Sequence, residues 1–419
     1  MKNTLLLLVL ITVFSGCSKD ADDENSLLQE FKVTINIDSD YRFGTFIKSA
    51  RAFLSDENGV ILDSAELEVG KTTVLISSGD PGAVYDLSYM KYADLDILGE
   101  ESYTLTTFSN IDQGDYTFAP RHYIENNDDE IFLDINNIGY PSEKTSPNPG
   151  NGTFGPENGG YYKFNGNLVS SPISDFYISF KSPNDQFERY LWKENVDEGS
   201  VFEVDFNTLP EMLNIVNVQV PDNKIYNFRL EGLVNGNEQN ILHSIREGNY
   251  SNGRTFISIP LPSDIFESYL FDVSFGNDTF NYFKTIRTAT IPNSIDAPEL
   301  FFSVNGLSEA NFEMTTNGEA VIYNVIFRGT NSNETVSVAH SIYGEIKPEI
   351  SFYKQNLRLN IQLAYPELNG FENIGLGSVL LMNYSTIDSY KEIVKYKIQG
   401  EGNEIPENGY NEGIGKRFD

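Results

Sequence analysis

Hydrophobic and polar residues alternate with a period of two along most of the chain. Phe31, Val33, Ile35 and Ile37 are separated by Lys, Thr and Asn, a pattern that buries one face of a strand and leaves the other in water. The same alternation recurs in three further segments: Phe202, Val204 and Phe206; Leu359, Ile361, Leu363 and Tyr365; and Val394, Tyr396 and Ile398. Each of these segments is predicted to be a half-buried strand.

Helical periodicity is not sustained anywhere, and the pattern allows only one short helix, over 263–270. Clusters of Gly, Asn, Asp and Pro separate the strand candidates at intervals of about 8–12 residues, which favours antiparallel sandwiches. The 53 Tyr and Phe side chains suit half-buried pleated surfaces. We therefore expect an all-β protein made of tandem antiparallel β-sandwich domains, immunoglobulin-like or transthyretin-like in type.

At about 100–200 residues per domain, 419 residues should form two to four domains. We expect a first sandwich over 31–122 and a middle β-rich domain over 123–297. Four Pro and five Gly at 141–160 predict a long surface loop within the middle domain. About eight strand candidates over 298–400 suit one immunoglobulin-like sandwich, and the polar, glycine-rich stretch 401–419 is expected to be a loose tail.

The first domain contains a predicted hairpin. Residues 56–59 read Asp-Glu-Asn-Gly, a turn between strands at 52–54 and 60–62, and the all-apolar second strand is expected to be fully buried. Together with the alternating stretch 84–89, this region resembles the transthyretin-like sandwich known as the carboxypeptidase regulatory-like domain. That family usually carries Gly-x-Pro-Leu and Gly-Ala after the turn, where this chain has Ile-Leu-Asp-Ser-Ala at 61–65.

The N-terminus has the features of an export signal, with Lys2, an apolar stretch over 4–14, and small Ser15 and Gly16 before Cys17. Eleven apolar residues are too few to cross a bilayer, which takes about 20. The sequence around Cys17 resembles the lipobox of bacterial lipoproteins, which implies removal of 1–16 and lipidation of Cys17. Because Cys17 is the sole cysteine, no internal disulfide can form, and lipidation would remove a lone thiol. The alternative is a plain secretion signal that contains a cysteine.

Residues 17–30 are predicted to be a solvated, disordered tether, since 18–25 is acidic and almost free of apolar side chains. This stretch resembles the acidic signal that sends lipoproteins of the Bacteroidota to the outer face of the outer membrane. Ser18 stands where aspartate would resemble an inner-membrane retention signal. We expect a protein anchored in the outer membrane and exposed at the cell surface, although any linker beside a membrane could share this composition.

The formal charge of −32, from 29 basic and 61 acidic residues, excludes nucleic acid and anionic membrane surfaces as partners that would bind through charge. It fits a solvated exterior or a divalent-cation binder. Glu125, Asp128, Asp129 and Glu130 are clustered oxygen ligands that could hold a structural Ca²⁺, with a solvated acidic turn as the favoured alternative. No other cofactor is expected.

Candidate catalytic chemistry is sparse. The three histidines, His122, His243 and His340, are about 100 residues apart and accompany no Gly-x-Ser-x-Gly or zinc motif, so a structural role is favoured for each. The GxGxxG string at 150–155 lacks the strand and helix that a dinucleotide site requires. Carboxylate pairs for glycoside hydrolysis cannot be chosen from 61 acidic residues without geometry. No catalytic residue is assigned.

Aromatic side chains and one short motif supply the remaining site candidates. Tyr161, Tyr162, Tyr190 and Trp192 could stack on sugar rings, although core packing is favoured for them. The Asp-Ser-Ala at 63–65 resembles the O-glycosylation sequon of Bacteroidota and makes Ser64 the candidate acceptor.

These features predict a non-enzymatic lipid-anchored surface protein that binds a glycan, a peptide or a partner outer-membrane protein through sandwich loops. It resembles the accessory surface lipoproteins of Bacteroidota. The alternatives are a surface hydrolase that uses carboxylate catalysis in the middle domain, and a purely structural or assembly component.

Overall fold

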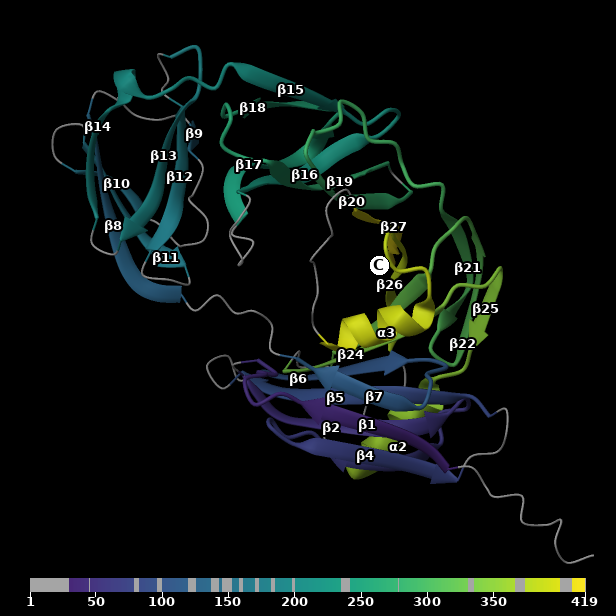
Figure 1. Ribbon diagram of the computed structural model, residues 1–419. Coiled ribbons are helices and arrows are strands. Elements are labelled where there is room, and N and C mark those ends of the chain that lie inside the picture. The colour runs from purple at the N-terminus through teal and green to yellow at the C-terminus, as the bar shows by residue number, and fades with distance from the viewer. Residues whose placement is uncertain are drawn as a thin grey trace, which may run out of the picture.

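A computed structural model gives the fold of the chain (Figure 1). The structure describes residues 30–44, 46–78, 83–95, 100–119, 126–136, 143–144, 153–157, 161–169, 173–181, 185–197, 200–234, 242–277, 279–330, 335–365, 374–399 and 409–418. Most of these residues lie in strands, and the predicted all-β fold is confirmed. No helix among the described residues is long and apolar enough to cross a bilayer.

The N-terminal unit packs two sheets face to face. One sheet has the order β4-β1-β7, and the other contains β3-β2-β5-β6. The strands are β1 (Glu30–Ile37), β2 (Ile47–Asp56), β3 (Ile61–Glu66), β4 (Thr72–Ser78), β5 (Tyr85–Leu95), β6 (Glu100–Phe108) and β7 (Gly114–Phe118). The predicted strand at 31–38 is confirmed as β1, in which Val33, Ile35 and Ile37 are buried.

The predicted hairpin joins β2 to β3. Asp56 Oδ1 accepts hydrogen bonds from the N–H groups of Asn58 and Val60 at 2.9 and 2.8 Å, and Gly59 supplies the φ of 78° that the turn needs. The expectation of a fully buried second strand is wrong, since Val60 is 48% exposed and Leu62 is 40% exposed. β3 lies at the end of its sheet, and one of its faces meets solvent.

The second unit contains two small sheets, with orders β10-β11-β8-β14 and β13-β12-β9. Its elements are β8 (Asn126–Asn136), β9 (Glu143–Lys144), β10 (Thr153–Glu157), β11 (Tyr161–Val169), β12 (Ile173–Lys181), β13 (Arg189–Asp197), β14 (Val201–Asp205) and the 3-10 turn η1 (Phe206–Thr208). The loop predicted over 141–160 therefore contains two short strands. Pro156 fits there because β10 is an edge strand, one of the few places in a sheet where proline is found.

The third unit pairs β15 with β18 and packs them against β17-β16-β19-β20. The strands are β15 (Asn214–Gln219), β16 (Lys224–Leu233), β17 (Leu242–Arg254), β18 (Phe256–Leu261), β19 (Ser268–Gly276) and β20 (Asn281–Thr288). The short helix allowed at 263–270 does not form, since β19 begins at Ser268. The second unit has an apolar cluster of its own, and its Tyr177 and Tyr190 also pack into the apolar cluster of the third unit.

The C-terminal unit consists of β21 (Phe301–Ser308), β22 (Asn311–Asn317), β23 (Ile322–Thr330), β24 (Val336–Glu345), β25 (Glu349–Phe352), α2 (Gln355–Ala364), β26 (Gly375–Tyr384), α3 (Tyr390–Gln399) and β27 (Tyr410–Arg417). Two predicted strands are helices instead. In α2, Leu357 and Ile361 are buried four residues apart, and in α3 the buried residues Tyr390, Ile393, Val394 and Ile398 follow helical spacing.

The stretch expected as a loose tail contributes β27, which pairs with β26 on one side and β20 on the other. Its glycines make this close pairing feasible, because a Cβ on Gly413 would lie 2.4 Å from Leu381 O. The end of the chain is therefore a central strand of a large sheet.

One continuous sheet links three of the units, in the order β17-β16-β19-β20-β27-β26-β23-β24-β6-β5-β2-β3 (Figure 1). The parallel pair β24–β6 joins the N-terminal and C-terminal units, so the sandwiches expected at 31–122 and 298–400 share a sheet. Residues of β1, β4, β7 and α3 cover one face of the shared sheet, and residues of β21, β22, β25 and α2 cover the other.

Candidate functional site

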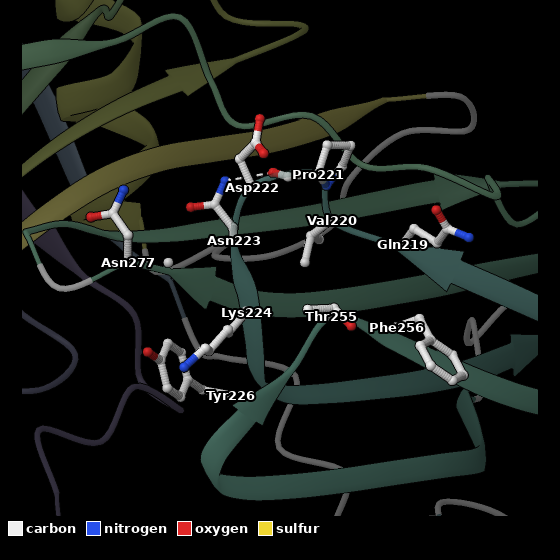
Figure 2. A pocket seen from close by; sticks show the side chains of 11 residues that line it. Gln219, Val220, Pro221, Asp222, Asn223, Lys224, Tyr226, Thr255, Phe256 and Asn277 are labelled. Carbon is white, nitrogen blue, oxygen red and sulfur yellow. Dashed lines mark hydrogen bonds between the residues drawn. The ribbon is translucent and has the colours of Figure 1, made fainter.

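The third unit has an open pocket of about 650 Å³ at one end, where its strands turn (Figure 2). Three connections form it: β15 to β16, β17 to β18, and the start of the β19 to β20 turn. The residues lining the pocket are Gln219, Val220, Pro221, Asp222, Asn223, Lys224, Tyr226, Thr255, Phe256, Gly276 and Asn277. Loops at the end of a rigid sandwich commonly bind ligands.

Local hydrogen bonds fix the shape of these turns. Asp222 has a φ of 58°, and Asn223 Nδ2 donates to Pro221 O at 3.0 Å. Across the pocket, Asn277 Oδ1 accepts from the N–H groups of Thr279 and Phe280 at 2.9 and 3.0 Å. Asn and Asp are typical of such turns because their short side chains bond the nearby backbone.

One polar atom in the pocket lining has unused bonding capacity. Asn223 Oδ1 is shielded from solvent and has no hydrogen-bond partner in the described part of the chain. An amide oxygen without a partner is costly, and a hydroxyl or N–H donor would satisfy it. Figure 2 shows the Asn223 amide between Asp222 and Asn277.

The pocket continues onto the outer face of the β15–β18 pair. Cross-strand register sets Gln219 opposite Phe256 and Asn217 opposite Ser258. Ser258 Oγ donates to Asn217 Oδ1 at 2.5 Å, and the Phe256 ring is 56% exposed. We call this surface the β15–β18 face. It places an aromatic ring, amides and a hydroxyl side by side on two adjacent strands.

The formal charges in the pocket lining are few: a single carboxylate, Asp222, and a single amine, Lys224. Glycoside hydrolysis by the usual route needs two carboxyl groups about 5–10 Å apart. The described lining therefore lacks the second carboxyl group for that chemistry. The arrangement is suited to binding through hydrogen bonds and stacking.

A second group of polar residues has the connectivity of a catalytic triad but is closed to substrates. His340 on β24 contacts Thr107 Oγ1 through Nε2 at 2.8 Å and Glu309 Oε1 through Nδ1 at 2.5 Å. The series extends to Ser88 on one side and Arg358 of α2 on the other, at 2.8 Å each. All five side chains are at most 2% exposed. We call them the buried polar network, and their burial indicates a structural role.

A buried ion pair lies beside this network. Lys354, the residue before α2, contacts Asp86 of β5, and its Nζ also donates to Glu57 O at 3.3 Å. Burial raises the pKa of Asp86, while Lys354 and the Asn110 N–H act to lower it. The backbone N–H of Lys354 donates to Glu309 O at 3.1 Å. Together these contacts attach the start of α2 to the sheet.

Several predicted site residues lie outside the described residues, namely Cys17, His122 and Glu125. The other calcium candidates, Asp128, Asp129 and Glu130, fall within β8 and not in a turn before a strand. Over the described ranges, no group of three or more His, Cys, Asp or Glu side chains is placed to hold a metal ion.

The four aromatic candidates are not brought together at the pocket. Tyr161 and Tyr162 begin β11, where they pair with Glu157 and Pro156 of β10. Tyr190 is buried on β13, and its ring stacks on Tyr177. Trp192 packs edge-on against His243 and Phe266, with ring centroids 5.2 and 6.0 Å apart. The Tyr190 and Trp192 rings therefore form part of the packing between the second and third units.

Ser64, the candidate O-glycosylation acceptor, lies in β3 and is half-buried. Its Oγ accepts a hydrogen bond from Arg51 Nη2 at 3.2 Å. Oδ1 of the neighbouring Asp63 accepts a hydrogen bond from the N–H of Ser64. Its Oδ2 accepts one from the N–H of Ile76 at 2.9 Å, which connects β3 to β4.

The pocket residues were not predicted from the sequence. The sequence did contain a signal for a strand followed by a turn. Ile215, Asn217 and Gln219 alternate with valines, and Pro221–Asn223 is a strong turn cluster. Such turns recur throughout the chain, and only folding shows that three of them adjoin one another.

No protein-family profile and no curated protein matches the chain. Among solved structures, a variant of the major pilin of Streptococcus pyogenes aligns at 7% sequence identity over 76% of this chain and 99% of the pilin. The TM-score of this alignment is 0.09.

Proposed function

We propose that this protein is a lipid-anchored outer-membrane surface protein that binds a glycan, without catalysis, at the pocket and the β15–β18 face of its third unit. The lipobox-like sequence at Cys17 and the acidic stretch after it support the anchor and the surface location. We further propose kinship with the accessory surface lipoproteins of Bacteroidota, with a transthyretin-like sandwich at the N-terminus.

The observation that carries the glycan assignment is the exposed Phe256 ring beside the amide groups of Gln219, Asn223 and Asn277. Aromatic faces pack on the C–H groups of a sugar ring, and amides donate to and accept from its hydroxyl groups. Tyr226 adds a second ring to the lining.

A neutral glycan is the favoured ligand, because the lining has one acidic and one basic side chain. The open shape of the pocket and the continuous β15–β18 face suit a chain of several sugar units. A peptide or an outer-membrane protein is the alternative occupant, and binding of either in place of glycans would contradict the proposal.

The test is a glycan array probed with the full chain purified in detergent, followed by calorimetric titration of the strongest glycan. Phe256→Ala should weaken binding by roughly tenfold, since base or ring stacking on an aromatic side chain contributes about 1–3 kcal/mol. Gln219→Leu should weaken it further, because an exposed amide that donates to and accepts from sugar hydroxyl groups is removed.

Phe301→Ala is the matched control. Phe301 is 54% exposed on β21, outside the pocket, and its removal should leave glycan affinity unchanged. Absence of any glycan signal, or equal losses for Phe256→Ala and Phe301→Ala, would contradict the proposed site.

The anchor is tested separately with Cys17→Ala. Loss of the acylated cysteine should move the protein from the membrane fraction to the soluble fraction, since lipid chains supply about 0.8 kcal/mol per buried CH₂ group. Replacing the charged residues of 19–24 with neutral ones should reduce surface labelling of whole cells while membrane association persists. Unchanged fractionation of the Cys17→Ala chain would refute lipid anchoring.

A further inference from the structure

Two arginines line a second pocket, about 570 Å³ in volume, in the C-terminal unit. Arg328 comes from β23 and Arg417 from β27, and the strand between them, β26, supplies Gly375, Leu376, Gly377 and Ser378. Phe418 completes the lining. This pocket shares no residue with the glycan pocket of the third unit.

The register explains why the sheet is hollow here. Arg328 pairs with Gly375, and Arg417 pairs with Ser378, so the two arginines flank the same short stretch of β26. The backbones of β23 and β27 are about 10 Å apart, at two strand spacings. Between them, Gly375 and Gly377 carry no side chain, so the backbone itself forms the floor.

A β-bulge shapes the floor. Ile326 pairs with Ser378 and Phe327 with Leu376, which leaves Gly377 as the extra residue of β26. Gly377 O accepts from the N–H of Phe418 at 2.9 Å, which fixes the end of the chain beside the pocket. β-bulges change the direction of side chains on a strand and are common next to active sites.

The two guanidinium groups lie in a chain of strong negative charge. Acidic residues outnumber basic ones 61 to 29, and Arg189, Arg229, Arg246 and Arg358 each contact a carboxylate. Arg328 and Arg417 are exposed, and neither forms an ion pair with a carboxylate of the described residues. Two cations therefore lie beside one glycine-floored hollow, and the described lining holds no carboxylate.

We propose that this pocket binds a small ligand carrying an oxyanion, a carboxylate or a sulfate, held between Arg328 and Arg417. A guanidinium presents paired N–H donors that match the two oxygens of such a group. The Ser378 hydroxyl is placed to add a further hydrogen bond. Because the whole chain is strongly acidic, an extended polyanion is repelled, and a compact acidic molecule is accepted.

The test is calorimetric titration of the full chain with three probes: sodium sulfate, galacturonate and galactose. Binding of both sulfate and galacturonate would indicate a general oxyanion site, whereas binding of galacturonate alone would indicate a site that requires a carboxylate on a sugar. Galactose is the uncharged counterpart of galacturonate. Arg328→Gln and Arg417→Gln should each weaken binding of the acidic probe roughly tenfold or more, since each removes charge-assisted hydrogen bonds.

Gly375→Leu tests the hollow itself while both charges remain. A Cβ at position 375 would meet only Arg328 O, at 3.9 Å, so the backbone has room for a side chain here, and the leucine is designed to fill the pocket. Binding should be lost while the melting temperature is unchanged. Arg42→Gln, which removes an exposed arginine between β1 and β2, is the charge-matched control and should bind like the parent chain.

Binding of sulfate, galacturonate or both, lost in the two arginine variants and in Gly375→Leu, supports the proposal. Absence of binding by both acidic probes, equal binding of galactose and galacturonate, or unchanged affinity in the arginine variants overturns it. Sulfate binding should be unaffected by Phe256→Ala, so failure of the glycan site and failure of this site are distinguishable.

Discussion

His340 and His243 are both buried in strands, yet their surroundings are opposite. His340 uses both ring nitrogens, bonding Thr107 and Glu309 within the buried polar network. His243 is 1% exposed and packs against Trp192 and Phe266, and neither of its nitrogens has a hydrogen-bond partner among the described residues. Burial without hydrogen bonds lowers the pKa of His243 to about 4.

The comparison shows two ways in which a sheet protein joins its parts. The buried polar network connects three pieces of chain: the shared sheet through His340, the β21–β22 turn through Glu309, and α2 through Arg358. The aromatic cluster around His243 packs the second unit against the third, and a single ion pair, Arg246–Glu188 at 2.9 Å, accompanies it. Polar contacts fix one orientation but fail if one member is lost, whereas apolar packing tolerates substitution.

The largest effect is expected from Glu309→Leu. This substitution removes the carboxylate that both His340 and Arg358 contact, so buried polar groups lose their partner. The free energy of unfolding should fall by about 3–5 kcal/mol, measured by urea denaturation. Adding Arg358→Met should recover part of the loss, because the unpaired cation is then absent. The control is Glu345→Leu, at an exposed position, which should change the free energy of unfolding by less than about 0.5 kcal/mol. Equal losses for Glu309→Leu and Glu345→Leu would refute the role of the buried polar network.

A smaller, pH-dependent effect is expected at His243. Between pH 6.5 and about 4 the unfolded chain binds a proton at this histidine and the folded chain does not, so stability falls as the pH falls. The loss across this window is roughly 3 kcal/mol at 1.36 kcal/mol per pKa unit, and above pH 6.5 it vanishes. His243→Leu should remove this part of the slope in unfolding curves recorded from pH 7 to 4. Parallel curves for the variant and the parent chain would contradict the assignment.

The smallest effect is expected from Thr107→Val, which keeps the shape of the side chain but removes the hydroxyl between Ser88 and His340. Stability should fall by about 1 kcal/mol, the usual net contribution of a hydrogen bond, since His340 keeps its contact with Glu309. Thr104→Val, on the opposite face of β6, is the matched control and should be nearly neutral. A larger loss at position 104 than at 107 would place the main contribution outside the network.

The local sequence pattern was enough to predict a strand with one solvated face and the turn that follows a strand. The alternation at β1 and the Asp-Glu-Asn-Gly turn before β3 were predicted correctly because side-chain period and turn chemistry act over a few residues. The same reasoning failed for α2 and α3. In segments of about ten residues, apolar spacings of two and of three to four overlap, and contacts with the covering sheet select the helix.

The candidate sites were predicted less well than the strands. Packing was favoured over sugar binding for Trp192 and Tyr190, which lie between the second and third units, whereas Phe256 and Tyr226 of the pocket lining were not singled out. Nothing in the local sequence distinguishes an exposed aromatic from a buried one on a short strand. Likewise, Arg328 and Arg417 are 89 positions apart, and only the order β23-β26-β27 places them on one pocket.

The sequence by itself determined the strand-rich composition, some strand positions, the excess of acidic residues and the export-signal pattern, because each depends on residue type or on neighbours within one element. The tertiary structure alone decided that β6 pairs with β24 and β20 with β27, that 410–417 forms a central strand, and which turns share a pocket. These outcomes depend on pairings between residues far apart in the chain. Backbone hydrogen bonds and apolar faces are alike in every strand, so only the simultaneous packing of all units selects the partners.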